Sequence, residues 1–274
     1  MRAAALLGLA VAGALALGAC TGTGGPAAAP SDTRPVVRIA AAADLKFALE
    51  EVVELVGDAH PEITITTSYG SSGVFLSQIR NGAPFDLYLS ADLAYPRALV
   101  EEGLAAEEDL FPYAVGRLVL WAGEGGVVDP ADGLAALASP DVRNVAVANP
   151  EHAPYGVAAV EALRSAGVYA AVEDKLVYGE NVAQAAEFVQ SGNADVGIVA
   201  LSLVRSDPLR DVGAWVELPL DAYPRLDQGG VVLGSARDVD AARLVRDAML
   251  GPDGAAILER YGFSLPGDDA ADGG

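Results

Sequence analysis

The sequence has very little of several residue types on which common functions depend. It contains one cysteine, Cys20, two histidines and only two lysines, Lys46 and Lys175, in 274 residues. The absence of cysteine after position 20 excludes a disulfide framework and thiol chemistry. No apolar segment after the first 19 residues is long enough to span a bilayer.

Positive charge is also scarce, with 17 Lys and Arg against 38 Asp and Glu, a net charge of −21. Such a chain has little with which to neutralise phosphates along a groove, which argues against nucleic acid. It argues equally against electrostatic docking on anionic lipid. The simplest interpretation is a well-solvated acidic surface. Hydrophobic residues make up 52% of the chain, enough to bury one or two cores.

The N-terminus has the features of an export signal. Arg2 precedes an apolar run over 3–17, and small residues lead to Cys20. This segment resembles the lipobox of bacterial lipoproteins, in which the cysteine is lipidated and becomes the first residue. We therefore expect a signal peptide at 1–19 and a lipidated, flexible tether at 20–35. The alternative is an ordinary secretory signal with an incidental cysteine. Cleavage removes only Arg2 of the charged residues, which leaves 16 − 38 = −22.

Beyond the tether, short apolar runs alternate with segments of helical periodicity, which predicts an α/β fold with parallel or mixed sheets. The predicted strands are 36–41, 63–69, 86–90, 116–122, 145–148 and 196–200. The predicted helices are 45–56, 74–80, 93–102, 156–166 and 183–190. No internal repeat is evident.

Four strand-to-helix junctions have unusual compositions. Ligands of open α/β sheets bind at such junctions, where helix N-termini favour anions. Each junction also has a simpler interpretation as a capped or rigid turn. The four are Ala-rich 40–45, which places Asp44 at an N-cap, the Tyr-Gly-Ser-Ser-Gly of 69–73, the Asn-Pro-Glu-His-Ala-Pro-Tyr-Gly of 149–156, and the Tyr-Gly-Glu-Asn-Val of 178–182. Two precede residue 115 and two follow it, as a cleft between two lobes requires.

Together with Gly-Ala-Pro-Phe-Asp-Leu-Tyr-Leu-Ser-Ala-Asp at 82–92, these segments resemble the periplasmic molybdate-binding proteins of molybdenum ABC transporters. The resemblance extends from about residue 36 to 265. It implies a two-lobed type II periplasmic-binding-protein fold with a ligand cleft between the lobes. It places lobe I at 36–115 plus 223–274 and lobe II at 116–222.

The resemblance also implies how the ligand is held. Hydroxyl groups and backbone amides donate to the oxyanion, and no counter-charge is needed. Matched by position, the Ser72 hydroxyl and the backbone N–H groups of Tyr155 and Val182 are the expected donors. The chain departs from the family pattern at Ala200, where a tyrosine often donates its hydroxyl. Tyr155 or Ser202 is a candidate replacement.

Asp44 is the second departure, because it stands where the family often has serine. A carboxylate about 4 Å from an anionic charge costs roughly 4 kcal/mol at an effective dielectric near 20. We expect the Asp44 side chain to turn away from the ligand and cap its helix, which leaves only the Asp44 backbone N–H to bind the ligand. The alternative is that it accepts a proton carried by the ligand, which suits hydrogen phosphate. Lys46 is near enough in sequence to offset its charge.

The sequence therefore predicts an exported binding protein, either lipid-anchored at the outer face of the cytoplasmic membrane or periplasmic. Its expected ligand is molybdate or tungstate, carried as an anion and not as a bare metal cation. Its expected partner is the membrane permease of an ABC importer. We expect a monomer without a cofactor and without catalytic activity. Alternatives are a binder of phosphate or sulfate, a secreted hydrolase that pairs Ser72 with His152, and the sensor lobe of a regulator.

Overall fold

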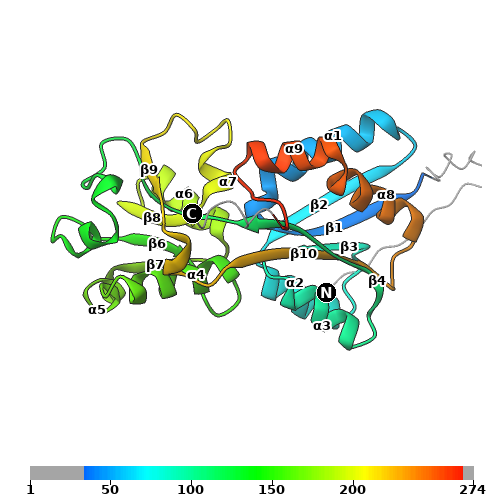
Figure 1. The fold of residues 1–274 in the computed structure, drawn as a ribbon, viewed down its shortest axis with the longest axis horizontal. Helices are drawn as coiled ribbons and strands as arrows, with labels where there is room; N and C mark the ends of the chain where they lie inside the picture. Colours follow the sequence, from blue (N-terminus) through cyan, green and yellow to red (C-terminus); the bar gives the residue numbers. More distant parts are fainter. Residues whose placement is uncertain (1–33, 268–274) are drawn as a thin grey trace, which may run out of the picture. The chain divides into compact units, whose positions relative to one another are not determined.

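The computed structural model describes residues 34–267. The expected signal peptide, the lipidation site Cys20 and nearly all of the tether lie outside these residues. Within the described part, no helix has the length and apolar character that a membrane span requires. The fold consists of two lobes, each built on a five-stranded mixed sheet (Figure 1).

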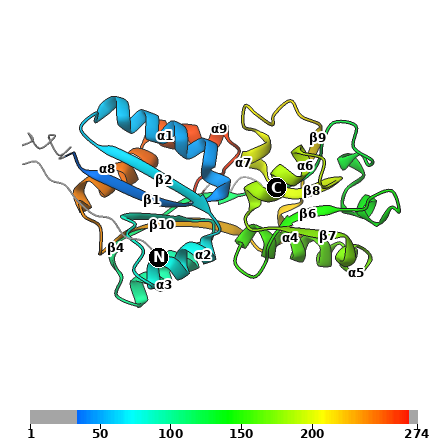
Figure 2. The ribbon, with the colours of Figure 1, turned by 180° about the vertical axis from the view of Figure 1, so that it is seen from behind.

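The sheet of the first lobe has the strand order β2-β1-β3-β10-β4. Strands β1, β2 and β3 are parallel, whereas β10 runs antiparallel to both β3 and β4. Helices α1, α8 and α9 cover one face, and α2 and α3 cover the other (Figure 2). The elements are β1 Val36–Ala42, η1 Ala43–Leu45, α1 Lys46–Ala59, β2 Thr64–Gly70, α2 Ser72–Arg80, β3 Leu87–Ser90, α3 Ala94–Glu101, β4 Ala105–Gly116, β10 Leu226–Leu233, α8 Val239–Leu250 and α9 Pro252–Arg260.

The second lobe repeats this plan with the order β7-β6-β8-β5-β9. Strands β6, β7 and β8 are parallel, and β5 is antiparallel to β8 and β9. Helices α4 and α6 pack against the sheet from opposite faces (Figure 1). The elements are β5 Leu118–Ala122, η2 Pro130–Asp132, η3 Leu134–Ala138, β6 Val145–Ala148, α4 Pro154–Ser165, α5 Tyr169–Val172, η4 Glu173–Lys175, β7 Leu176–Gly179, α6 Val182–Gln190, β8 Val196–Ala200, α7 Leu201–Val204, β9 Ala214–Glu217 and η5 Leu220–Ala222.

The chain crosses between the sheets twice, from β4 to β5 and from β9 to β10. Gly116 ends β4 at the first crossing, where a Cβ atom would lie 2.3 Å from the Tyr155 hydroxyl. Only glycine fits there without displacing the tyrosine. Three small residues of the first lobe, Ala42, Ala43 and Ala91, belong to the apolar core of the second. Small side chains at these positions let the lobes approach closely.

Candidate functional site

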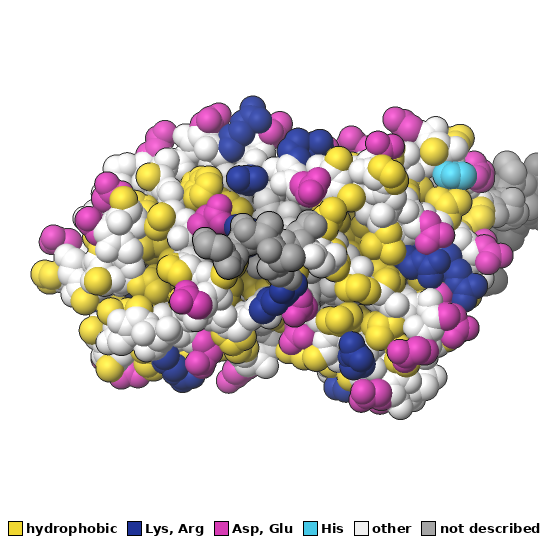
Figure 3. All heavy atoms as spheres, viewed as in Figure 1, with side chains coloured by type: hydrophobic (Ala, Val, Ile, Leu, Met, Phe, Trp, Pro, Cys, Tyr) yellow, Lys and Arg dark blue, Asp and Glu magenta, His cyan; other side chains and the backbone are white. Residues whose placement is uncertain are grey.

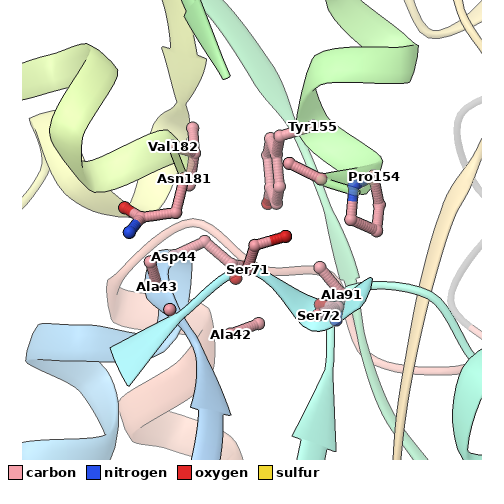
Figure 4. A pocket seen from close by; sticks show the side chains of 12 residues that line it. Ala42, Ala43, Asp44, Ser71, Ser72, Ala91, Pro154, Tyr155, Asn181 and Val182 are labelled. Atoms are coloured by element: carbon pink, nitrogen blue, oxygen red, sulfur yellow. Dashed lines mark hydrogen bonds between the residues drawn. The ribbon is translucent and has the colours of Figure 1, made fainter. Parts of the chain in front are cut away.

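The carboxyl ends of the parallel strands of both sheets meet at one cavity between the lobes. The space between its atoms is about 200 Å³, which includes open solvent, and only about 10 Å³ of it can hold the centre of a water molecule. Figure 4 shows the first-lobe residues below the cavity and the second-lobe residues above it. The lining residues are Ala42, Ala43, Asp44, Gly70, Ser71, Ser72, Ala91, Ala153, Pro154, Tyr155, Asn181 and Val182. All four residues expected to bind the ligand are therefore present in one place.

Ser72 is the first residue of α2, and its hydroxyl proton is free to face the cavity. Ser72 Oγ accepts a hydrogen bond from the Ala91 N–H at 3.0 Å, which leaves its own proton available. The preceding Ser71 occupies the N-cap position but does not cap the helix. Its hydroxyl instead donates to the carbonyl of His152 in the other lobe. The Gly73 N–H donates to the same carbonyl at 2.9 Å, so this loop contacts α2 across the cleft.

Val182 is the first residue of α6, and the side chain that caps this helix does not accept a hydrogen bond from its backbone N–H. The Asn181 side chain accepts from the N–H groups of Ala183 and Gln184, at 3.0 and 3.1 Å. The first N–H of a helix has no intrahelical acceptor. Within residues 34–267 the Val182 N–H has no hydrogen-bond acceptor, and Val182 lines the cavity.

Tyr155 presents a third donor of the same kind at the start of α4. Pro154 has no N–H, and the N–H groups of Gly156 and Val157 both donate to the Ala153 carbonyl, at 2.9 and 3.1 Å. Among the described residues, the Tyr155 N–H therefore has no acceptor. Gly156 permits this tight turn, because a Cβ there would lie 2.3 Å from the Ala148 carbonyl oxygen.

The positive partial charge that lines the cavity comes from backbone dipoles and not from cationic side chains. Of the described residues, none that lines it is Lys, Arg or His. The N-termini of α2, α4 and α6 all point at it, and each contributes partial positive charge. On the face drawn in Figure 3, Asp and Glu side chains are spread over both lobes. The local site therefore favours an anion that the overall charge repels at long range.

Asp44 does not cap a helix, so that expectation was wrong. No side chain caps η1 or α1, for which Ala42 and Leu45 occupy the N-cap positions. The buried carboxylate instead accepts a hydrogen bond through Oδ2 from Gln228 Nε2 at 2.6 Å, while Oδ1 has no partner. Burial raises the pKa of Asp44 from 3.8 to about 6, against the opposing effects of Gln228 and the Tyr155 phenol.

A comparison with known proteins assigns this architecture to a family. The model of the bacterial extracellular solute-binding proteins matches residues 37–264. The chain belongs to this family. It is 41% identical to the molybdate-binding protein ModA of Azotobacter vinelandii over 73% of this chain and 79% of that protein. It is 38% identical to ModA of Rhodobacter capsulatus over 92% of this chain and 95% of that protein.

Solved structures agree with this assignment of the solute-binding protein. The periplasmic molybdate-binding protein of Azotobacter vinelandii superposes with a TM-score of 0.78 and 30% identity. The match covers 84% of this chain and 99% of that one. The two-lobed α/β fold expected from the sequence is thus confirmed.

The hydrolase alternative does not fit the site of a solute-binding protein. The His152 ring contacts the Glu180 carbonyl through Nε2 at 3.1 Å, and no described hydrogen bond joins it to Ser72. No cluster of three His, Cys, Asp or Glu side chains suited to a metal ion occurs in the described part of the chain. Family membership identifies a protein that binds solutes and not an enzyme.

Two residues of this solute-binding protein have roles that the sequence did not reveal. Ser202 does not replace the donor missing at Ala200, because its hydroxyl donates to the Asp44 carbonyl at 2.8 Å. Gln228 is fully buried on β10 and joins Asp44 to the Tyr155 hydroxyl, 3.2 Å from its Nε2. A glutamine just before Gly-Gly-Val-Val-Leu is the one sequence signal that marks this position as unusual.

Proposed function

We propose that this protein captures molybdate, or tungstate, in the cavity and delivers it to the membrane permease of an ABC importer. The relatives from Azotobacter vinelandii and Rhodobacter capsulatus are both molybdate-binding proteins, which supports this assignment. The observation that carries it is the set of donors left without acceptors: the Ser72 hydroxyl and the N–H groups of Tyr155 and Val182.

The position of these donors accounts for capture. Ser72 belongs to the first lobe, and Tyr155 and Val182 belong to the second, so one tetrahedral anion bonded to all three joins the lobes. The proposed boundaries are 36–115 plus 223–274 for lobe I and 116–222 for lobe II. Opening about the two crossings then admits or releases the ligand, as in other hinged binding proteins. Hydrogen bonds from these neutral donors to a doubly charged anion are charge-assisted, and they are therefore stronger than bonds between neutral groups.

Export and anchoring form part of the same proposal. Residues 1–19 are removed as a signal peptide, Cys20 carries the lipid, and residues 20–35 tether the protein to the outer face of the cytoplasmic membrane. A lipid-anchored monomer near its permease releases the ligand directly at the importer. No resident cofactor takes part, because molybdate is the cargo.

A second candidate ligand is hydrogen phosphate, and one observation favours it. The unpartnered carboxylate oxygen of Asp44 accepts a hydrogen bond from a protonated oxyanion without any change in its own charge. Sulfate, like molybdate and tungstate, offers no proton at neutral pH, so the same oxygen does not favour it.

A ligand panel tests the assignment. The purified protein, without its signal peptide, is titrated with molybdate, tungstate, sulfate, phosphate and chromate by calorimetry, and its thermal unfolding is followed with each. Molybdate and tungstate are expected to bind at one site and to raise the unfolding temperature. A ligand at a hundred times its Kd stabilises the fold by about 2.7 kcal/mol. Strong binding of phosphate without binding of molybdate contradicts the assignment.

A further inference from the structure

Asp44 is the one side chain in the cavity lining that carries charge at neutral pH. It is 1% exposed, and its two carboxylate oxygens are in different situations. Oδ2 is committed as an acceptor to Gln228, whereas Oδ1 is buried without a partner in the described structure. A buried acceptor left without a donor is unfavourable, and such groups often mark a function.

The groups packed around Asp44 leave its charge uncompensated. Gln228 of β10 and Ser202 of α7 are neutral. Tyr155 of α4 and Tyr113 of β4 face it, and burial raises the pKa of each phenol well above 10, so both stay neutral. Gln228 and Tyr155 lower its pKa, as do the backbone N–H groups of Asp44 and Leu45 in η1.

Lys46 does not offset the charge as its position in the sequence suggests. Its ammonium group lies 5.4 Å from the centre of the Phe47 ring and lines a separate cavity with Ala183 and Leu203. Asp44 lines the binding cavity, and none of the described residues that line it carries a positive charge. Either the carboxylate repels the ligand or it takes up a proton when the ligand arrives.

We propose that the binding of an oxyanion dianion is coupled to the uptake of one proton by Asp44, which then donates a hydrogen bond from Oδ1 to a ligand oxygen. The proton comes from solvent and forms an O–H bond on Oδ1, and no other covalent bond of the protein or the ligand is made or broken. The existing bond from Gln228 to Oδ2 is compatible with a proton on Oδ1. Protonation of Asp44 thus removes its repulsion of the ligand and lets Oδ1 form a hydrogen bond. This inference rests on the proposed function, because it requires an anion in the cavity.

The coupling has a defined sign. Asp44 in the free protein has a pKa of about 6, and a nearby dianion raises that pKa further. Between the two pKa values the free protein is ionised and the complex is protonated, so rising pH disfavours binding. Affinity is expected to fall about tenfold for each pH unit above 6, until the pKa of the complex is reached.

Calorimetry measures the coupling directly. Sodium molybdate is titrated into the protein at pH 7.5 in two buffers that differ in ionisation enthalpy, and the difference in heat gives the number of protons taken up. About one proton for each molybdate is expected in the wild type. The Kd, measured from pH 6.5 to 8.5, is expected to rise by roughly a hundredfold, because molybdate itself stays a dianion over this range.

Asp44→Asn is the matched control. Asparagine keeps the shape, accepts from Gln228 and donates to the ligand from the same place, as a protonated aspartic acid does. The variant is expected to bind molybdate with no proton uptake and with a Kd that does not change with pH. Because every other ionisable group remains in the variant, these groups contribute equally to both proteins. Asp44→Ser serves the same purpose if the asparagine variant does not fold.

The outcomes separate this inference from the proposed function. Binding of molybdate by the wild type without proton uptake overturns the inference and leaves the function standing. The inference is also overturned, with the function left standing, if the Kd of Asp44→Asn depends on pH as the Kd of the wild type does. No binding of molybdate at any pH from 6.5 to 8.5, by either protein, overturns the proposed function and the inference with it.

Discussion

Replacing Ser72 with alanine removes a hydroxyl donor that the site provides from the first lobe. The Ser72 hydroxyl does two things in the structure. Its oxygen accepts from the Ala91 N–H at 3.0 Å, and its proton remains for the cavity. The substitution is therefore expected to lower both ligand affinity and the stability of the free protein, for separate reasons.

The size of each effect follows from the type of bond. A hydrogen bond from a neutral hydroxyl to a charged acceptor contributes about 1.5–3 kcal/mol, so Kd for molybdate is expected to rise roughly ten- to a hundredfold. The Ala91 N–H loses its acceptor, which costs about 1–3 kcal/mol of unfolding free energy. At this chain length, that corresponds to roughly 2–4 °C in Tm for each kcal/mol.

Ser90→Ala provides the matched control in the same region. Ser90 is fully buried, and its hydroxyl bonds only the backbone of Asp92, at 2.8 and 3.1 Å. Its loss is expected to lower Tm by a similar amount and to leave the Kd for molybdate unchanged. Calorimetric titration and thermal unfolding of both variants measure the two effects. Unchanged affinity in Ser72→Ala, or an equal loss of affinity in both variants, refutes the assignment of Ser72 as a donor.

Three further substitutions test the account. Asp44→Asn is expected to stabilise the free protein by about 3 kcal/mol above pH 6. The Asp44 carboxyl has a pKa of about 6 in the folded protein and 3.8 as its ordinary value, so the stability of the wild type falls as pH rises from 4 to 6. Urea unfolding of both proteins at pH 4 and 7 measures the difference in unfolding free energy, which is expected to vanish at pH 4. Gly73→Ala places a Cβ 2.7 Å from the His152 carbonyl oxygen, so it is expected to hinder closure of the two lobes and to weaken molybdate binding at least tenfold. Gly57→Ala is the control, because a Cβ at position 57 has no atom within 4 Å, and it is expected to leave the Kd unchanged. Asn181→Ala removes the cap of α6, and a loss of about 1 kcal/mol in unfolding free energy with a severalfold weaker affinity is expected, whereas an unaltered Tm contradicts the capping role.

The sequence identified the elements that contain the cavity because their patterns are local. Strand 36–41 and the helix that follows became β1 and α1, and the predicted strand 145–148 coincides with β6. Their apolar residues recur at the period of the element they form. Asp44, Ser72, Tyr155 and Val182 all line the cavity because parallel strands end at the same edge of a sheet. Their role as ligand donors stays a prediction.

The elements that escaped prediction have patterns that depend on their neighbours. Strand β4 carries two glutamates and a proline, which it accommodates as the edge strand of its sheet. Strand β10 contains Gly229 and Gly230, where any Cβ would collide with side chains of packed elements. No local signal predicts such a strand, because only the assembled sheet explains its glycines.

The error at Asp44 has the same origin. Aspartate before a helix is usually a cap, and local statistics favour that role. The carboxylate instead bonds Gln228, 184 residues away in the sequence. This hydrogen bond forms only in the folded protein, near the strands that cross between the lobes. The sequence around Asp44 therefore does not predict it.

The central claim is that molybdate occupies the cavity between the lobes and is held by neutral donors. A crystal of the protein grown with molybdate, with diffraction recorded at the molybdenum absorption edge, tests this most directly. The account predicts one anomalous peak, with ligand oxygens about 2.7–3.2 Å from Ser72 Oγ and from the backbone nitrogens of Tyr155 and Val182. A molybdenum peak elsewhere, or an empty cavity at saturating molybdate, contradicts it.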